Sequence, residues 1–381
     1  MKSREVAQSL VSLASHYPVV TLTGPRQTGK TTLTKAVFPG HRYVSLEDPD
    51  LTEFARTDPR GFLDDLGPKA ILDEVQREPA LLSYLQRRVD EDPTPGRYIL
   101  TGSENLALRQ GIGQSLAGRT GLLTLLPFSL GEAYGNSPPD LDVALFRGLY
   151  PRIHDRDLPP SQALAFYVST YVERDVRALA QIQDLTRFQS FLGLCAGRTA
   201  QLLNYSSLAA DAGVSVNTAK SWVSVLEASY LVRRLMPYHG NITSRLSKSP
   251  KLYFVDVGLA AWLLGIREAS QLQNHPLRGA LFETLMVTEA WKAQENAADT
   301  SPMYFFRDSN QREIDLVRET GDGLDLYEIK SGRTITTDWF RQLAWGRENL
   351  PRVRNCRVVY GGAEGRIQSG IGIQSWRQRV W

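Results

Sequence analysis

Cysteine is scarce in this sequence, since only Cys195 and Cys356 occur among its 381 residues. Two distant cysteines cannot build a framework of several disulfide bonds, and their spacing matches no common metal-ligand pattern. The scarcity therefore excludes a disulfide-rich secreted scaffold and a cysteine-based metal centre. It also predicts a protein of a reducing compartment, the cytoplasm.

Long apolar runs are missing as well. Residues 122–130 form an apolar stretch, but Pro127 interrupts it, and no stretch reaches the length of a membrane span. Residues 1–18 lack the apolar core of a signal peptide, and the sequence contains no internal repeat. These absences predict a cytoplasmic globular protein without a membrane partner.

The sequence also lacks a strong excess of charge of either sign. Its 44 basic and 41 acidic residues leave a net charge of +3, and its hydrophobic fraction of 42% is ordinary for a globular protein. Such mild basicity permits contact with nucleic acid without predicting it. A chain of 381 residues is too long for one core, so two or three domains are expected.

The clearest motif that is present lies at residues 24–31. Its sequence, GPRQTGKT, follows the phosphate-loop pattern G-x-x-x-x-G-K-[ST]. An apolar run at residues 19–22 precedes it and predicts a buried strand, and residues 32–37 after it predict the first turns of a helix. The strand–loop–helix setting makes the motif a predicted nucleotide-binding site.

Each fixed residue of this motif has a physical role. Gly24 and Gly29 allow backbone angles that turn successive N–H groups toward phosphate oxygens. Lys30 is predicted to reach the β- and γ-phosphates, and the Thr31 hydroxyl to ligate Mg²⁺. The predicted cofactors are therefore ATP and Mg²⁺. The residues predicted to bind ATP are Gly24, Pro25, Arg26, Gln27, Thr28, Gly29, Lys30, Thr31 and Thr32.

Further strands are predicted to alternate with helices after this loop. These strands span residues 42–46, 70–74, 97–103 and 121–128. The alternation predicts a parallel sheet with helices on both faces. Asp73 and Glu74 close one apolar strand, where Asp73 is placed to hold the Mg²⁺ shell and Glu74 to polarise the attacking water. A whole strand lies between the two motifs, and this order resembles the additional-strand class of P-loop ATPases, which includes the AAA+ proteins.

The AAA+ resemblance implies two further roles. A polar residue at the end of the fourth strand acts in AAA+ proteins as a sensor of the terminal phosphate, and Thr101 or Ser103 stands at that place; the alternative is an ordinary strand-end turn. Arg119 precedes the fifth strand, where AAA+ proteins place an arginine finger that reaches the nucleotide of a neighbouring subunit. The alternative is a surface arginine at a helix end. The finger would require a homo-oligomer.

A helix-turn-helix with a wing is predicted in the middle of the chain. One helix begins at residues 203–209, a tight turn follows at 212–215, and a second helix spans 216–226. Residues 231–235 then predict the first strand of a wing. The second helix carries a single lysine, which is too little positive charge to neutralise several DNA phosphates. A packing role is therefore favoured over sequence-specific contact with DNA.

The last third of the chain contains a predicted β-hairpin. Period-two alternation at residues 313–317 and 326–330 places Glu328 and Lys330 on one face of the second strand, near Asp315 on the first. Glu283, from a preceding helix, is predicted to join them.

This arrangement resembles the PD-(D/E)XK nuclease superfamily. There the carboxylates hold Mg²⁺ and the lysine positions water, which would make Glu283, Asp315, Glu328 and Lys330 a second metal site. The alternative is that arginines such as Arg307 or Arg312 fill the pocket and balance its charge, and this structural outcome is favoured.

Nearly the whole chain resembles a prokaryotic family of AAA+ ATPases with a C-terminal domain of unknown function. The motifs that carry the resemblance are GPRQTGKTTL (24–33), SLEDPDL (45–51), ILDEVQ (71–76), LTGS (100–103), SLAGR (115–119), YVERDV (171–176), the winged helix (205–235) and EIDLV…YEIKSG (313–332). The resemblance implies an α/β fold class in three parts. These are a P-loop AAA+ parallel-sheet ATPase core (1–130), a helical lid with the winged helix (131–246) and a restriction-endonuclease-like α/β domain (247–381).

The implied function is ATP binding and hydrolysis by an AAA+ protein that acts on or with nucleic acid or a partner protein. Two alternatives stay open. One is an ATP-gated, Mg²⁺-dependent DNA nuclease, and the other is a nucleotide-sensing, DNA-binding regulator. Lys30, Asp73 and Glu74 together favour turnover over sensing alone.

Overall fold

A computed structural model of the chain describes residues 2–103, 115–176, 184–239 and 248–381, with the backbone alone at 173–176. The chain divides into two compact units. The first comprises Met1–Phe128, Ala228–Tyr230 and Gln294–Asp299, and the second comprises Ser129–Glu227, Leu231–Ala293 and Thr300–Trp381. The second unit thus includes most of both the predicted lid module and the predicted C-terminal domain.

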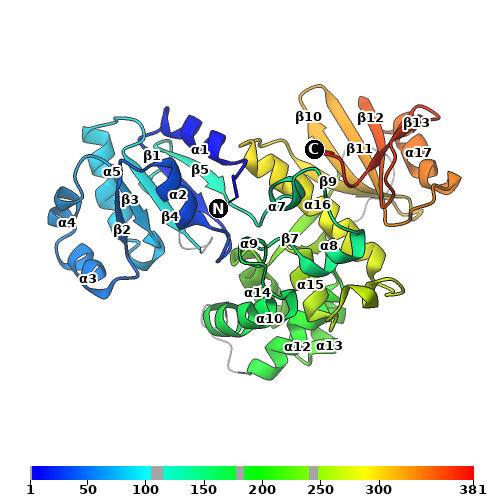
Figure 1. The fold of residues 1–381 in the computed structure, drawn as a ribbon, viewed down its shortest axis with the longest axis horizontal. Helices are drawn as coiled ribbons and strands as arrows, with labels where there is room; N and C mark the ends of the chain where they lie inside the picture. The colour runs from blue at the N-terminus through cyan, green and yellow to red at the C-terminus, as the bar shows by residue number, and fades with distance from the viewer. Residues whose placement is uncertain (1, 104–114, 177–183, 240–247) are drawn as a thin grey trace. The chain divides into compact units, whose positions relative to one another are not determined.

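The first unit is built on a five-stranded, all-parallel sheet (Figure 1). Its strands, in order across the sheet, are β2 (Arg42–Ser45), β3 (Ala70–Asp73), β4 (Tyr98–Gly102), β1 (Val19–Thr23) and β5 (Thr120–Thr124). Its helices are α1 (Ala7–Ala14), α2 (Lys30–Val37), α3 (Pro49–Thr57), α4 (Pro59–Asp65), the short 3₁₀ helix η1 (Val75–Arg77) and α5 (Leu81–Glu91). The predicted parallel sheet is confirmed.

Both faces of this sheet are buried against helices. Successive residues of a strand point to opposite faces, so neighbouring residues belong to different core clusters. Leu72 and Leu100 belong to a core cluster shared with α4 and α5, whereas Ile71 and Ile99 belong to a second cluster shared with α1 and α2. Parallel strands also bring their carboxyl ends to one edge. The residues that follow β1, β3 and β4 therefore meet there, and β4 lies between the strands that carry the two predicted ATPase motifs.

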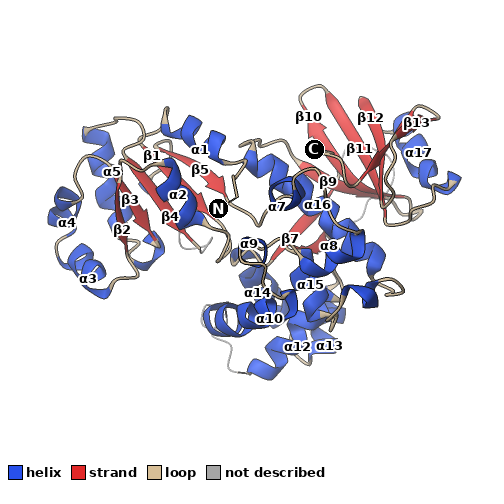
Figure 2. Ribbon diagram, in the orientation of Figure 1, coloured by secondary structure: helices blue, strands red, loops and turns tan. Residues whose placement is uncertain are grey.

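The second unit contains a mixed nine-stranded sheet (Figure 2). Its strands, in order across the sheet, are β13 (Arg366–Gln368), β14 (Ile371–Ser375), β12 (Val353–Tyr360), β11 (Gly323–Lys330), β10 (Glu313–Thr320), β9 (Met303–Arg307), β7 (Val232–Pro237), β8 (Lys251–Phe254) and β6 (Gln201–Leu202). The predicted hairpin is present as β10 and β11, which pair antiparallel.

Helices cover much of the second unit. They are α7 (Leu130–Tyr134), α8 (Leu141–Arg147), α9 (Pro151–Asp155), α10 (Pro160–Tyr167), the π-helical segment η2 (Val168–Val176), α12 (Leu185–Ala196), α13 (Tyr205–Ala212), α14 (Val216–Ala228), α15 (Val257–Leu263), η3 (Ala269–Leu272), α16 (Arg278–Asn296), η4 (Thr337–Phe340) and α17 (Arg341–Asn349). Among the residues that the structure describes, no helix is long and apolar enough to cross a bilayer.

The helix-turn-helix is present as predicted, but the strand predicted to open the wing pairs with other strands on both of its sides. Gly213 ends α13 in the left-handed conformation (φ 64°), which makes the tight turn into α14. The strand after α14, β7, pairs with β8 on one side and with β9 on the other. The predicted wing is therefore an interior strand of the nine-stranded sheet.

Candidate nucleotide-binding site and carboxylate cluster

The loop between β1 and α2 needs its two glycines. Gly24 has a φ of 144°, and a Cβ atom there would lie 2.2 Å from the carbonyl oxygen of Leu125. Gly29 is left-handed (φ 88°) and forms the N-cap of α2. Only glycine adopts both conformations without strain, so the loop geometry follows directly from the motif.

Hydrogen bonds within the loop and from Arg4 hold the phosphate loop in place. The Thr28 hydroxyl donates to the carbonyl of Pro25 (2.9 Å), and the Arg4 guanidinium donates to the carbonyls of Thr28 and Leu126 (2.7 Å each). Gln27 has a positive φ of 64° at the exposed tip of the loop. The contact with Arg4, which precedes α1, was not predicted from the sequence.

Lys30 is buried inside this loop. Its ammonium donates to the carbonyl oxygens of Gly24 and Pro25, both at 2.9 Å. Burial lowers the pKa of Lys30 to about 8, although the nearby Glu74 and Asp73 carboxylates oppose the shift. The loop thus holds the lysine by neutral acceptors, at the start of a helix whose N-terminus favours anions.

Asp73 gathers three hydroxyl groups. One of its carboxylate oxygens accepts hydrogen bonds from Thr31 and Tyr43, each at 2.8 Å, and the other accepts from Thr101. The structure therefore joins the threonine of the phosphate loop to the acid of β3, the two residues that were predicted to serve Mg²⁺. Burial and the bond to Asp73 raise the pKa of Tyr43 to about 12, so the phenol keeps its proton and donates.

Glu74 has donors of its own. Ser103 donates to its carboxylate at 3.1 Å, and the Gln76 amide donates both to this carboxylate and to Ser103. The backbone of Glu74 is left-handed, with a φ of 57°. Such strain in a residue other than glycine is characteristic of functional sites. The two sensor candidates therefore have different partners, because Thr101 donates to Asp73 and Ser103 donates to Glu74.

Arg119 pairs with a different acid. Its guanidinium forms a two-pronged ion pair with Asp90 near the end of α5, with nitrogen–oxygen distances of 2.5 and 3.0 Å. It also donates to the carbonyl of Ala117. Within its own chain Arg119 therefore forms an ion pair near the end of α5. Its role as an arginine finger toward a neighbouring subunit remains a prediction.

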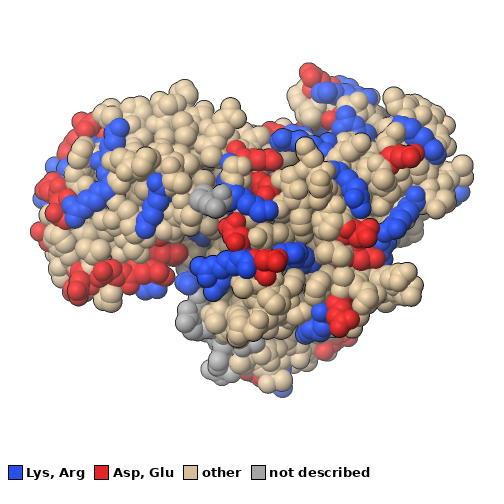
Figure 3. Space-filling model, in the orientation of Figure 1, with Lys and Arg blue, Asp and Glu red and all other residues tan. Residues whose placement is uncertain are grey.

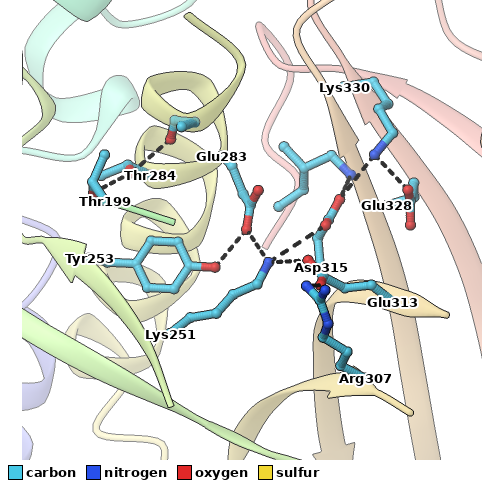
Figure 4. Close-up of polar contacts among 12 residues, drawn as sticks. Thr199, Lys251, Tyr253, Glu283, Thr284, Arg307, Glu313, Asp315, Glu328 and Lys330 are labelled. Carbon is cyan, nitrogen blue, oxygen red and sulfur yellow. Dashed lines mark hydrogen bonds and ion pairs between the residues drawn. The ribbon is translucent and has the colours of Figure 1, made fainter. Parts of the chain in front are cut away.

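A second polar cluster lies in the second unit, where Figure 4 shows the predicted C-terminal residues. Lys330 lies 2.5 Å from Glu328 and 3.5 Å from Asp315, and the Ile329 N–H donates to the same Asp315 oxygen at 2.7 Å. Glu283 belongs to the same cluster through its neighbour Lys251. Among the described residues, no group of three or more acidic, histidine or cysteine side chains is arranged to hold a metal ion.

Lys251 was missed in the sequence. It is the first residue of β8 and contacts Glu283 (2.8 Å), Glu313 (2.6 Å) and Asp315 (3.9 Å). A signal was present, because the lysine opens the apolar run KLYFV and a lysine in a buried strand needs carboxylate partners. Of the two predicted arginines, Arg307 pairs with Glu313 at 2.5 Å, while Arg312 contacts Asp308.

Two curated relatives match almost the whole chain. The uncharacterized proteins Mb2031c of Mycobacterium bovis and Rv2008c of Mycobacterium tuberculosis are each 31% identical to it over 366 residues, which cover 95% of this chain and 80% of each relative. The chain belongs to their family. Within it, residues 16–134 match an AAA domain, and residues 138–270 and 278–375 match two domains of unknown function, DUF8612 and DUF4143.

This family membership makes the N-terminal part an AAA-type ATPase domain and implies ATP binding. Among solved structures, the Walker-type ATPase PABY2304 of Pyrococcus abyssi is 16% identical with a TM-score of 0.44, over 68% of this chain and 94% of its own. AMPPCP-bound DnaA from Aquifex aeolicus is 17% identical with a TM-score of 0.29, over 58% and 85%. These similarities do not establish the nuclease-like fold predicted for the C-terminal part.

Proposed function

We propose that the protein binds ATP with Mg²⁺ and hydrolyses it at the AAA-type domain. The observation that carries the proposal is the contact between Thr31 and Asp73, which joins the phosphate loop to the acid of β3 at 2.8 Å. A chance glycine-rich turn would have no reason to meet a buried aspartate 42 residues further along the chain.

The residues present fit both ATP and Mg²⁺. The loop turns through two conformations that only glycine adopts easily, and it ends at a helix N-terminus, where anions are stabilised. Phosphate oxygens would replace the neutral carbonyls that Lys30 now contacts, and charged acceptors bind an ammonium more strongly. Thr31 and Asp73 offer the oxygen ligands that Mg²⁺ prefers, and the ion would neutralise phosphate charge when bound.

Glu74 is the proposed general base or water-orienting group. Its carboxylate is held by Ser103 and Gln76, so the side chain is positioned before a substrate arrives. It follows Asp73 directly, which keeps the base beside the residues proposed to bind Mg²⁺. The self-association implied by Arg119 is part of the same proposal.

A comparison of Glu74→Gln with Lys30→Ala tests this function. Glu74→Gln keeps the shape of the side chain, so nucleotide binding should persist while turnover falls by roughly 10²–10⁴. Lys30→Ala should weaken binding itself, since it removes the cation from the phosphates. Nucleotide binding by fluorescence titration and steady-state phosphate release measure the two effects, with exposed Glu91→Gln as the matched control. ATP turnover by Glu74→Gln at the parent rate would disprove the role of Glu74.

Nucleic acid is the proposed partner class, because charge is unevenly distributed along the chain. Residues 331–381 contain nine arginines and three acidic residues, a net charge of +6, whereas the whole chain carries +3. Lys and Arg side chains lie over the part of the molecule that holds β10, β11 and β12 (Figure 3). A basic surface attracts the phosphate backbone whatever the base sequence.

A further inference from the structure

The carboxylate cluster of the second unit already contains a cation. Only 2% of the Lys251 side chain is exposed, and its ammonium lies between Glu283 on α16 and the acids Glu313 and Asp315 on β10 (Figure 4). One buried charge thus connects three elements that are far apart in the sequence. The Tyr253 hydroxyl, also on β8, donates to the same Glu283 oxygen at 2.6 Å.

The remaining cluster charges are paired as well. Lys330 holds Glu328 and one oxygen of Asp315, and Arg307 holds Glu313. Four carboxylates therefore meet three basic side chains within the cluster. One oxygen of Glu328 is buried without a partner, but at the other cluster oxygens a divalent metal would compete with these basic groups, and it would have to lie close to a buried ammonium of like charge.

Lys251 is positively charged in this setting. Burial alone would lower its pKa, but the carboxylates of Glu283, Asp315 and Glu313 and the neighbouring Tyr253 outweigh burial and hold the pKa well above its usual value.

We propose that Lys251 is the resident cation of this cluster, and that its ammonium takes the place a divalent metal would need. The cluster then joins β8, α16 and β10 and excludes metal, so the nuclease-like set Glu283, Asp315, Glu328 and Lys330 does not load Mg²⁺ or Mn²⁺. This inference concerns the second unit alone and is independent of the proposed ATPase function.

Removing the lysine tests the proposal, because Glu283 then loses its cation and Glu313 and Asp315 each lose one of two, which should let the cluster bind a divalent ion. Full-length proteins without nucleotide, all carrying Asp73→Asn so that the N-terminal acid does not contribute, are titrated with Mn²⁺ by electron paramagnetic resonance. Lys251→Met should gain a bound Mn²⁺ ion that a further Asp315→Asn change removes. At about a hundredfold excess over the dissociation constant, Mn²⁺ should raise the melting temperature of Lys251→Met by roughly 5–10 °C. The exposed Lys69→Met is the matched control and should gain nothing.

Two results would overturn the proposal. The first is Mn²⁺ binding by the protein with Lys251 intact that Asp315→Asn abolishes, since the lysine would then move aside for metal. The second is a folded Lys251→Met protein that gains no Mn²⁺. Should Lys251→Met unfold in the absence of metal, refolding with Mn²⁺ must restore its circular dichroism spectrum, and failure of this rescue also counts against the proposal. The titration with intact Lys251 does not depend on how that variant folds.

Discussion

Each acid of the ATPase site has its own set of hydrogen-bond donors. Asp73 is held by Thr31, Tyr43 and Thr101, whereas the neighbouring Glu74 is held by Ser103 and Gln76. Asp73 is the last residue of β3, whereas Glu74 follows it with a left-handed backbone, so the two neighbouring carboxylates are oriented independently. One then serves the proposed Mg²⁺ and the other the attacking water.

This division predicts different effects for the two sensor candidates. Ser103→Ala removes a donor from Glu74, so it should lower kcat about tenfold with little change in nucleotide affinity. Thr101→Val keeps the shape but frees one oxygen of Asp73, so it should shift the Mg²⁺ concentration needed for half-maximal activity. Steady-state kinetics at varied ATP and varied Mg²⁺ separate the two. Equal effects of both substitutions on kcat and on Mg²⁺ dependence would contradict the division.

At this scale the sequence identifies the residues of local motifs and misses contacts across the sheet. Lys30, Thr31 and Asp73 were predictable because strand–loop–helix geometry and the end of a buried strand determine their positions. Tyr43 and Thr101 reach Asp73 only because β2 and β4 flank β3 in the sheet. Local sequence patterns do not predict this order of the strands. Lys251 escaped prediction for the same reason, since its partners lie on α16 and β10.

At the scale of elements, Asp256 joins the start of α15 to the turn after α8. One carboxylate oxygen caps α15 by accepting from the Leu259 N–H (2.9 Å), and the other accepts from the Leu149 N–H (2.7 Å). Gly148, with φ 63°, lies so close to Gly258 that a Cβ atom would come within 2.8 Å of its Cα atom. A buried acid and two glycines therefore let the two segments pack closely.

Replacing Asp256 should thus cost more than replacing an ordinary cap. Asp256→Ala removes the cap and leaves the buried Leu149 N–H unpaired, so the free energy of unfolding should fall by about 2–4 kcal/mol. Asn204→Ala, which removes the exposed cap of α13, should cost only about 1 kcal/mol. Urea denaturation followed by tryptophan fluorescence compares them. Similar losses for both variants would show that the link to Leu149 contributes little.

Element types were predicted more reliably than their pairing. The helix-turn-helix followed from local signals, namely apolar spacing and a glycine turn, and both helices are where these signals placed them. The strand predicted to open the wing is present as β7 and pairs with β8, but its second pairing, with β9 some 70 residues later in the chain, was not predicted. Such long-range pairing depends on which strand edges are unpaired in the folded unit. Period-two alternation predicts a strand but does not identify the strand with which it pairs.

At the scale of the whole molecule, the proposed finger role of Arg119 would link activity to self-association. In a single chain it is bound to Asp90, so a finger role requires this ion pair to open toward a neighbouring subunit. Mixing inactive Arg119→Ala with inactive Glu74→Gln should restore turnover at interfaces where an intact finger meets an intact Glu74. Asp90→Asn should release the finger and raise activity at low protein concentration. Turnover that is independent of concentration, in a protein that sediments as a monomer, would rule out the trans role.

The uneven charge of the chain leads to a prediction about nucleic acid. Binding that releases counterions weakens with salt, with a slope of about −0.9 for each phosphate contacted on duplex DNA. Replacing Arg341, Arg352 and Arg366, three exposed arginines of the basic C-terminal stretch, by alanine should therefore reduce DNA affinity at least tenfold and flatten the salt slope by about 2–3.

A matched triple variant decides whether position matters or only total charge. Arg60, Arg77 and Arg87 are exposed arginines of the first unit, and replacing them by alanine removes the same net charge. If the C-terminal arginines form the docking surface, this control should change affinity less than twofold, because the removed charges would make none of the phosphate contacts. Fluorescence anisotropy with duplex DNA at several salt concentrations measures both variants. Equal losses would mean that net charge alone attracts DNA, and binding that ignores salt would exclude the phosphate backbone as the ligand.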